Sequence, residues 1–298
     1  MKIVVTGSLG NISQPLTREL VQKGHLVTVI SSKPEKQNEI EALGAVAAIG
    51  TVEDVQFLTT AFTGADAVYT MLPPPDFSNP NLDFTARANK IADNYVQAIQ
   101  EAGVKHVVHL SSIGAHTNKD NGILLWAYNL EQMLNELPSD VAITFMRPVG
   151  FYYNLLGFIN GIKTGGVIAS NYGADDVIPW VSPNDIAAAV AEEIVTSFVG
   201  RKISYVVSDE LSCDETARIL GSAIGKPDLK WLVIPDEQLL SGMKAFGLNE
   251  YLAEGFVEMN AAMHNGTLFE DYYRNKPALG KVKMTDYAKD FAAVYNQS

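Results

Sequence analysis

The residues best suited to chemistry stand near the start of the chain, in the segment Thr6-Gly7-Ser8-Leu9-Gly10-Asn11-Ile12-Ser13. Gly7 and Gly10 permit a tight turn free of side chains, and a helix is predicted to begin at about Asn11. A dinucleotide pyrophosphate needs this close backbone approach together with the free N–H groups of a helix N-terminus. A plain glycine turn is the alternative, and we favour nucleotide binding because the turn opens a complete β-α-β unit.

A second candidate segment, Ser31-Ser32-Lys33, follows the next apolar run. An NAD site usually places an Asp or Glu here for the ribose 2′-hydroxyl, and neither is present. Two hydroxyls and one ammonium instead suit a 2′-phosphate, and the alternative is an ordinary solvated loop. The segment therefore predicts NADP(H) as the preferred cofactor, with NAD(H) as the other possibility.

These segments are positioned by a repeating pattern over residues 2–146. Short apolar runs rich in Val and Ile alternate with amphipathic stretches of helical length. Strands that are apolar throughout are typical of a parallel sheet covered by helices on both faces. The predicted fold class is therefore α/β, a doubly wound parallel sheet of the NAD(P)-binding Rossmann type. Strands are expected over 3–6, 26–30, 45–49, 67–71, 106–110 and 142–146, and helices over 11–23, 53–62, 83–102 and 122–137.

Beyond Arg147 the pattern changes. Strands are expected over 177–181, 204–207 and 230–234, and helices from Pro183 and over 214–221. No Gly/Ser linker or run of charges separates the two parts. We predict a Rossmann domain over 1–150 and a smaller α+β substrate or partner lobe over 151–298, interleaved with the first, so that the substrate site lies between them.

Composition narrows the classes of partner. The chain has 298 residues, a hydrophobic fraction of 47% and a net charge of −12. A field of this sign repels phosphate backbones and anionic lipids, so we expect a small-molecule substrate and neither nucleic acid nor membrane as partner. Cys213 is the only cysteine, and the five histidines show no metal-ligand spacing, so no metal is expected. The sequence offers no signal peptide or long apolar run, which predicts a cytoplasmic protein.

Further motifs follow in a characteristic order. Leu110-Ser111-Ser112 closes a predicted strand, and Arg147-Pro148-Val149-Gly150-Phe151 is followed by Asn154. Together with the opening Thr-Gly-x-x-Gly-x-x-small motif, these segments resemble the NmrA-like group of atypical short-chain dehydrogenase/reductases, and its quinone-reductase-like members in particular. The resemblance extends over most of the chain, including Asp214-Glu215-Thr216 and Gly225-Lys226-Pro227.

The resemblance implies a set of cofactor contacts at the carboxyl ends of the parallel strands, where ligands of open α/β sheets bind. The pyrophosphate would lie against Gly7, Ser8, Leu9, Gly10, Asn11 and Ile12, and the adenosine ribose against Ser31, Ser32 and Lys33. Thr51 and Val52 would border the adenine, and Met71, Leu72, Pro73, Ser111 and Ser112 would approach the nicotinamide. Pro148 and Phe151 would shape the floor of the substrate pocket.

The chain departs from the Tyr-x-x-x-Lys pattern of active short-chain reductases. The comparable stretch is Tyr128-Asn129-Leu130-Glu131-Gln132, and the neutral amide of Gln132 cannot lower the pKa of a phenol by charge. Ser112 and Tyr128 are the catalytic candidates. Packing of Tyr128 on its helix is the stronger interpretation.

Quinone reduction is less affected by this departure. A quinone becomes aromatic on accepting a hydride, so holding it against the nicotinamide is enough if solvent supplies the protons. A flat ring would be bounded by Phe151, Tyr152, Tyr153 and Trp180, with His116 as a further candidate and Asn154 as a polar contact. For each aromatic residue, a plain core position is the alternative.

Two classes of function follow. The first is an NADPH-dependent oxidoreductase that passes a hydride to a quinone or a small electrophilic carbonyl compound. The second is a non-catalytic NADP(H) redox sensor that acts through a protein partner, a hypothesis drawn from the missing lysine. A nucleotide-sugar epimerase is disfavoured, since it needs the same Tyr-Lys pair.

Overall fold

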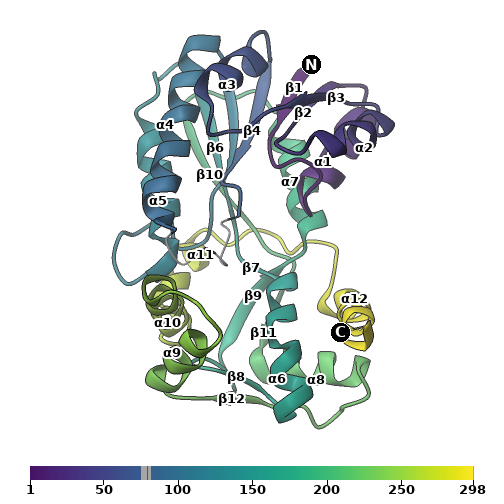
Figure 1. Cartoon of the computed structure of the whole chain (residues 1–298), viewed down its shortest axis with the longest axis vertical. Coiled ribbons are helices and arrows are strands. Elements are labelled where there is room, and N and C mark those ends of the chain that lie inside the picture. Colours follow the sequence, from purple (N-terminus) through teal and green to yellow (C-terminus); the bar gives the residue numbers. More distant parts are fainter. Residues whose placement is uncertain (75–78, 80–81, 298) are drawn as a thin grey trace.

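The chain folds around a seven-stranded parallel sheet, seen in the upper half of a computed structural model that describes residues 1–74, 79 and 82–297 (Figure 1). The strand order is β10-β6-β5-β4-β1-β2-β3, and every neighbouring pair is parallel. This confirms the predicted fold class. The strands are β1 Lys2–Val5, β2 Leu26–Ser31, β3 Val46–Ile49, β4 Ala67–Met71, β5 His106–Leu110, β6 Ala142–Pro148 and β10 Arg201–Val206.

The seventh strand comes from the second half of the chain. β10 pairs with β6 from Arg201 opposite Ile143 to Val206 opposite Pro148, so the run predicted over 204–207 belongs to the main sheet. The helix expected from Pro183 is α7 Pro183–Glu193, which packs against α1 Ser13–Gln22. The division into residues 1–150 and 151–298 remains a prediction. Two elements of the second range, β10 and α7, belong structurally with the first.

Helices cover both faces of the sheet (Figure 1). One face carries α3 Val55–Phe62, α4 Phe84–Ala102 and α5 Leu125–Asn135, and the other carries α1, α2 Gln37–Ala42 and α7. The apolar stripe of α4 is fully buried because it packs on the sheet between α3 and α5. The stripe consists of Ala88, Ile91, Ala92, Tyr95, Ala98 and Ile99.

The lower half holds two small sheets and most of the remaining helices (Figure 1). Its core is continuous with the core under α1 and α7, because Ile3, Met146, Trp231 and Phe291 belong to one buried cluster. The two halves therefore share a hydrophobic core. The strands are β7 Gly150–Phe151, β8 Ile168–Ser170, β9 Val177–Val181, β11 Asp209–Ser212 and β12 Trp231–Val233, and the helices are α6 Ile159–Gly165, α8 Cys213–Ala223, α9 Asp236–Ala245, α10 Glu250–His264, α11 Glu270–Arg274 and α12 Met284–Gln297.

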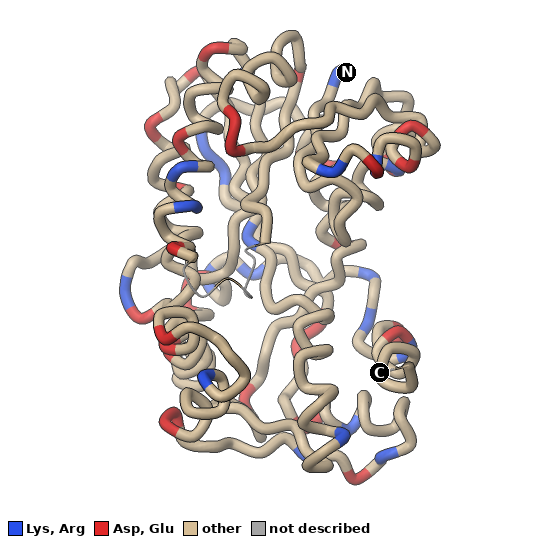
Figure 2. Tube along the Cα trace, viewed as in Figure 1, with Lys and Arg blue, Asp and Glu red and all other residues tan. Residues whose placement is uncertain are grey.

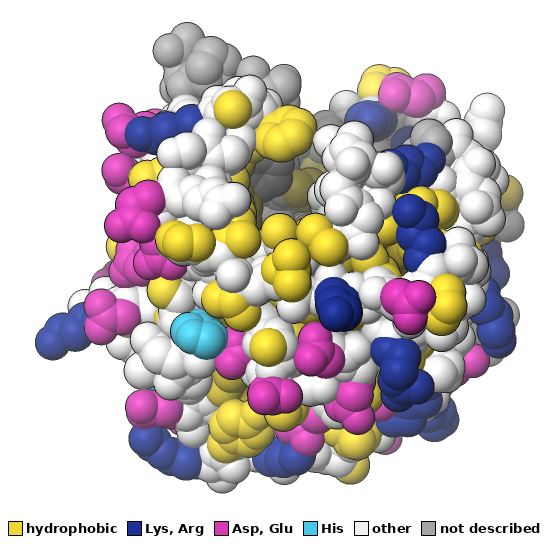
Figure 3. All heavy atoms as spheres, turned by 90° about the horizontal axis from the view of Figure 1, so that it is seen from below, with side chains coloured by type: hydrophobic (Ala, Val, Ile, Leu, Met, Phe, Trp, Pro, Cys, Tyr) yellow, Lys and Arg dark blue, Asp and Glu magenta, His cyan; other side chains and the backbone are white. Residues whose placement is uncertain are grey.

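Charged residues are distributed over both halves. Figure 2 shows Asp and Glu on helices throughout the molecule, which spreads the net charge of −12 over the surface. On the lower face, acidic and basic side chains break up the exposed apolar ones (Figure 3). Within the described part of the chain, no helix is both long and apolar enough to cross a membrane.

Candidate active site

A cavity of about 590 Å³ lies at the carboxyl ends of the strands in the first half of the chain. It is lined by the turn after β1, by the loops after β2, β3, β4 and β5, and by residues of α4, α5 and the segment that follows β6. The cavity brings together most of the predicted site. These residues are Gly7, Ser8, Gly10, Asn11, Ile12, Ser32, Thr51, Val52, Met71, Leu72, Pro73, Ser111, Ser112, Phe151 and Tyr153.

The turn after β1 has no room for a side chain at Gly7. Its φ is +89°, and a Cβ there would lie 2.5 Å from both Met71 Sδ and Ser13 Oγ. Ser13 stands where this type of turn often has its last glycine, and its buried hydroxyl donates to the carbonyl of Thr6 at 2.8 Å. The local fold therefore demands glycine at position 7 and a small residue at position 13.

The N-terminus of α1 opens into the cavity. No side chain caps this helix, whereas Asp54 caps α3 by accepting from the N–H groups of Gln56 and Phe57. Gly10, Asn11 and Ile12 line the cavity just before the first helical turn. Free N–H groups and the positive end of the helix dipole therefore face the space where an anion would bind.

The three predicted residues at the end of β2 have different surroundings. Ser31 is buried, and its hydroxyl oxygen accepts from Ser8 Oγ at 2.8 Å and from the Lys33 N–H at 3.2 Å. Ser31 thus ties the glycine turn to the end of β2. Ser32 lines the cavity, while the exposed Lys33 lies next to it and outside the lining.

Sequence reasoning missed an ion pair at one end of the cavity. Arg87 Nε, on α4, lies 2.9 Å from Glu53 Oε1, and Arg87 Nη1 donates to the carbonyl of Pro73 at 3.2 Å. Asn94, two turns further along the same face of α4, donates to the carbonyl of Val52 at 3.1 Å. These contacts fix the loops after β3 and β4. The available signal was position, because the first turns of α4 must lie at the carboxyl edge of the sheet.

The other lining residues absent from the prediction are mostly neighbours of predicted ones. Trp126 is the exception, since it comes from α5 and adds an aromatic side chain to the cavity. The neighbours are Ser13, Ile30, Gly50, Pro74 and Leu110.

An aromatic wall forms at the end of the cavity near β5 and β6. The rings of Phe151 and Tyr153 stack with centroids 5.0 Å apart and an interplanar angle of 29°. Burial raises the pKa of Tyr153 to about 12, so its hydroxyl stays protonated at neutral pH. Trp126 also lines the cavity, and its ring lies edge-on to Phe84 at the start of α4, with centroids 6.5 Å apart.

Tyr128 lies outside this cavity. Two positions along a helix correspond to a rotation of about 200°, so Tyr128 leaves α5 on nearly the opposite side from Trp126. It lines a separate cavity of about 310 Å³ together with His116, Gln132 and Arg147. The structure thus separates Tyr128 from Ser112, the other predicted catalytic residue.

Five other predicted contacts also lie outside the cavity lining. Tyr152 is fully buried and its hydroxyl donates to the carbonyl of Val282 at 3.1 Å. It opens the 3-10 turn Tyr152–Phe158, in which its side chain and that of Tyr153 point about 120° apart. Trp180 is buried within β9, and Pro148 is buried at the end of β6. Asn154 is exposed, and Leu9 packs on the core.

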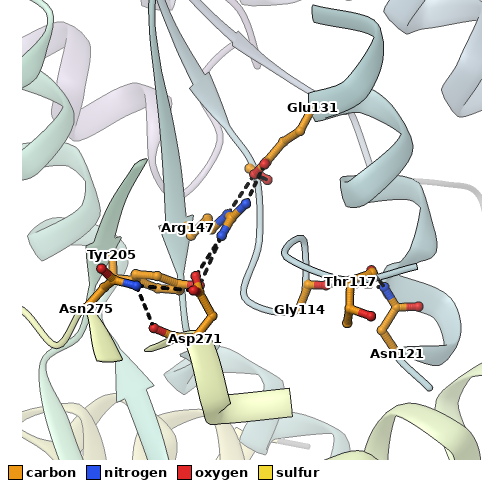
Figure 4. Close-up of polar contacts among 9 residues, drawn as sticks. Gly114, Thr117, Asn121, Glu131, Arg147, Tyr205, Asp271 and Asn275 are labelled. Carbon is orange, nitrogen blue, oxygen red and sulfur yellow. Dashed lines mark hydrogen bonds and ion pairs between the residues drawn. The ribbon is translucent and has the colours of Figure 1, made fainter. Parts of the chain in front are cut away.

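Behind the cavity, Ser111 contacts a buried ionic network, of which Figure 4 shows Glu131, Arg147, Tyr205 and Asp271. Its hydroxyl donates to Glu131 Oε1 at 2.5 Å, and Arg147 holds the same carboxylate through Nε at 2.9 Å and Nη2 at 2.6 Å. Arg147 Nη1 also contacts Asp271 Oδ2 on α11 at 3.0 Å, and Tyr205 donates to that oxygen at 2.6 Å. The side chains of Arg147 and Glu131 are only 4% and 3% exposed. The hydrogen of Ser111 is therefore engaged, because an ionised carboxylate can only accept.

The chain is similar to known proteins in sequence and in fold. A family model described as NAD(P)H-binding matches residues 7–195. The chain is 30% identical to an NAD(P)H azoreductase of Xenophilus azovorans, over 87% of this chain and 86% of that protein. It is 28% identical to a (4-alkanoyl-5-oxo-2,5-dihydrofuran-3-yl)methyl phosphate reductase of Streptomyces griseus subsp. griseus, over 76% and 74% of the two chains. The fold is similar to that of an NADPH-dependent quinone oxidoreductase from Escherichia coli complexed with NADPH, with a TM-score of 0.80, 20% identity and coverage of 97% and 99%.

Proposed function

The chain belongs to the NAD(P)H-binding family, and we propose that it is an oxidoreductase that passes a hydride from NADPH to a quinone or a small electrophilic carbonyl compound. The observation that carries this proposal is the composition of the 590 Å³ cavity. A glycine turn suited to a pyrophosphate and an aromatic wall suited to a flat acceptor line the same space.

The positions of the residues along the cavity indicate which part of the cofactor each of them would bind. The pyrophosphate would bind the turn from Gly7 to Ile12 and the open N-terminus of α1. Ser32 and Lys33 would hold the 2′-phosphate, and Thr51 and Val52 would border the adenine. Bound NADPH supplies a hydride, that is, two electrons and one proton equivalent. The absence of a carboxylate after β2 supports NADPH over NADH, since a carboxylate there would repel the extra phosphate.

The acceptor residues lie at the other end. Trp126, Phe151 and Tyr153 would hold a planar ring, and Met71 and Leu72 would exclude water from it. No metal is required for hydride transfer to such acceptors. The similarity to an NAD(P)H azoreductase and to a (4-alkanoyl-5-oxo-2,5-dihydrofuran-3-yl)methyl phosphate reductase supports the reduction of a small molecule.

NADPH oxidation with oxygen excluded tests the proposal. It is followed by absorbance against a panel of simple quinones and aromatic aldehydes, with NADH in parallel and the chain without acceptor as the blank. We expect turnover well above the uncatalysed rate and a preference for NADPH. Tight NADPH binding without turnover on any acceptor would instead favour the redox sensor, and absence of binding would refute both.

A further inference from the structure

Hydride transfer leaves a negative charge on the acceptor oxygen. A group in the cavity that donates a hydrogen bond or a proton would stabilise this charge. The acceptor end of the cavity carries three side-chain hydroxyls, those of Ser111, Ser112 and Tyr153. The Ser111 hydroxyl already donates to Glu131, whose carboxylate also accepts two hydrogen bonds from Arg147. Ser111 therefore presents only its lone pairs to a ligand and accepts hydrogen bonds there.

Of the two remaining hydroxyls, Tyr153 is the better proton source. A phenol is a stronger acid than the alcohol of Ser112, so it parts with its proton more readily. The ring of Tyr153 is fixed by stacking on Phe151, which itself lines the cavity. None of the hydrogen bonds among the described residues uses the Tyr153 hydroxyl, so it is available to a ligand.

We propose that the Tyr153 hydroxyl is the proton donor to the acceptor in this cavity, in the role that the sequence pattern would have given to Tyr128. The inference rests on the proposed function. Tyr128 is on the far side of α5, in the 310 Å³ cavity, and reaches neither the glycine turn nor the aromatic wall.

In the proposed step, the carbonyl carbon gains the hydride with its two electrons. The carbonyl oxygen forms a bond to the Tyr153 proton as the phenolic O–H bond breaks. The electrons of that bond stay on Tyr153 as a phenolate, which then takes a proton from water. The acceptor thus gains two electrons and two hydrogens, and the protein returns to its starting state.

A buried neighbour supports this assignment. Tyr69 is fully buried on β4, and its hydroxyl has no hydrogen-bond partner in the described part of the chain. Burial, together with charge interactions from Tyr95 and Tyr153, raises the pKa of Tyr69 well above its usual range. Tyr69 therefore stays protonated at neutral pH, so it does not compete for the proton of Tyr153.

The proposal distinguishes two kinds of acceptor. An alkoxide is a strong enough base to take the proton from a buried phenol, so carbonyl reduction should need the Tyr153 hydroxyl. The anion of a hydroquinone is a much weaker base, so Tyr153 would only hydrogen-bond to it and water would complete the reaction. Loss of the hydroxyl should therefore slow aldehyde reduction far more than quinone reduction.

The test compares Tyr153→Phe with Tyr128→Phe, two variants that each lose one hydroxyl from an aromatic side chain. Turnover at saturating NADPH is measured with an aromatic aldehyde and with a quinone. We expect Tyr153→Phe to lower kcat for the aldehyde by about 100-fold and for the quinone by less than about tenfold. Tyr128→Phe should stay within about twofold of the native chain for both, and the NADPH dissociation constant should be unchanged in both variants.

A second readout does not depend on turnover. 4-Nitrophenolate, a coloured oxyanion, is titrated into the chain saturated with NADP⁺. The Tyr153 hydroxyl should donate to it, so Tyr153→Phe should weaken its binding by about tenfold and Tyr128→Phe should leave it unchanged.

Turnover and nitrophenolate binding together distinguish a failure of the Tyr153 assignment from a failure of the proposed function. Undiminished aldehyde turnover or undiminished nitrophenolate binding in Tyr153→Phe would overturn the assignment of Tyr153. Equal losses in Tyr128→Phe would do the same. If the native chain reduces no acceptor, the proposed function fails, and the nitrophenolate titration still decides whether Tyr153 donates into the cavity.

Discussion

The two sides of helix α5 show how differently polar groups are used in this molecule. On one side, Trp126 lines the 590 Å³ cavity, together with Ser112, Tyr153 and the residues before the uncapped N-terminus of α1. On the other side, Glu131 is locked to Arg147 in a buried network that continues to Asp271 (Figure 4). The first region is arranged to bind, and the second is arranged to hold the sheet, α5 and α11 together.

Ser111 belongs to both regions. Its oxygen lines the cavity, while its hydrogen is committed to Glu131. Substitutions in the network should therefore act first on stability, and substitutions of side chains that only line the cavity should act first on ligands.

The largest effect is expected from Arg147→Met. Loss of the guanidinium would leave the Glu131 carboxylate buried without a counter-charge, at a cost of about 3–5 kcal/mol in the free energy of unfolding. Urea denaturation followed by circular dichroism measures this cost. The double variant Arg147→Met with Glu131→Leu should recover most of the loss, because no charge is then left unpaired. A single variant as stable as the native chain would show that the network does not hold the two halves together.

Gly7→Ala should have the next largest effect, and in the cavity. The new Cβ would collide with Met71 and Ser13 and distort the turn, so NADPH affinity should fall by about tenfold or more. Calorimetric titration with NADPH measures the loss. Gly24→Ala is the matched control, because Gly24 also has a positive φ, +82°, yet a Cβ there meets nothing within 4 Å. Equal affinity in both variants would contradict the place assigned to the pyrophosphate.

A smaller effect is expected from Lys33→Glu. The new carboxylate would repel the 2′-phosphate, so the ratio of NADPH to NADH affinity should fall by about fivefold. The two dissociation constants are measured at the same low ionic strength. Lys36→Glu, on the exposed turn Pro34–Lys36 and three residues further along, serves as the control for a general change of charge. An unchanged ratio in Lys33→Glu would refute the role given to Lys33.

Sequence reasoning anticipated the sheet well because its signals are local. Each strand of the first half is a continuous apolar run, and Gly24, Gly103 and Pro138 end the intervening helices within a residue or two of the observed positions. The place of β10 was not predicted, because the choice of neighbour for a strand depends on contacts far apart in the sequence. Only the structure shows that Arg201–Val206 pairs with β6.

Some residues of the site could be predicted from the sequence and others could not, because local signals do not determine every side-chain direction. Residues at the ends of strands, such as Gly7, Thr51 and Met71, reach the cavity because the topology sends every carboxyl end to the same edge. Side-chain direction was harder to predict. Tyr152 and Tyr153 are adjacent and equally aromatic, yet only Tyr153 lines the cavity, and Trp126 rather than Tyr128 is the cavity residue of α5.

The most direct test of the central claim is a crystal structure of the chain with NADP⁺ and 4-nitrophenolate. The account predicts the pyrophosphate at Gly7 to Ile12, and the nitrophenolate ring against Phe151 with its oxygen on the Tyr153 hydroxyl. A cofactor bound in the cavity with the nitrophenolate beside Tyr128 would contradict the catalytic assignment. A cofactor bound anywhere else would contradict the account as a whole.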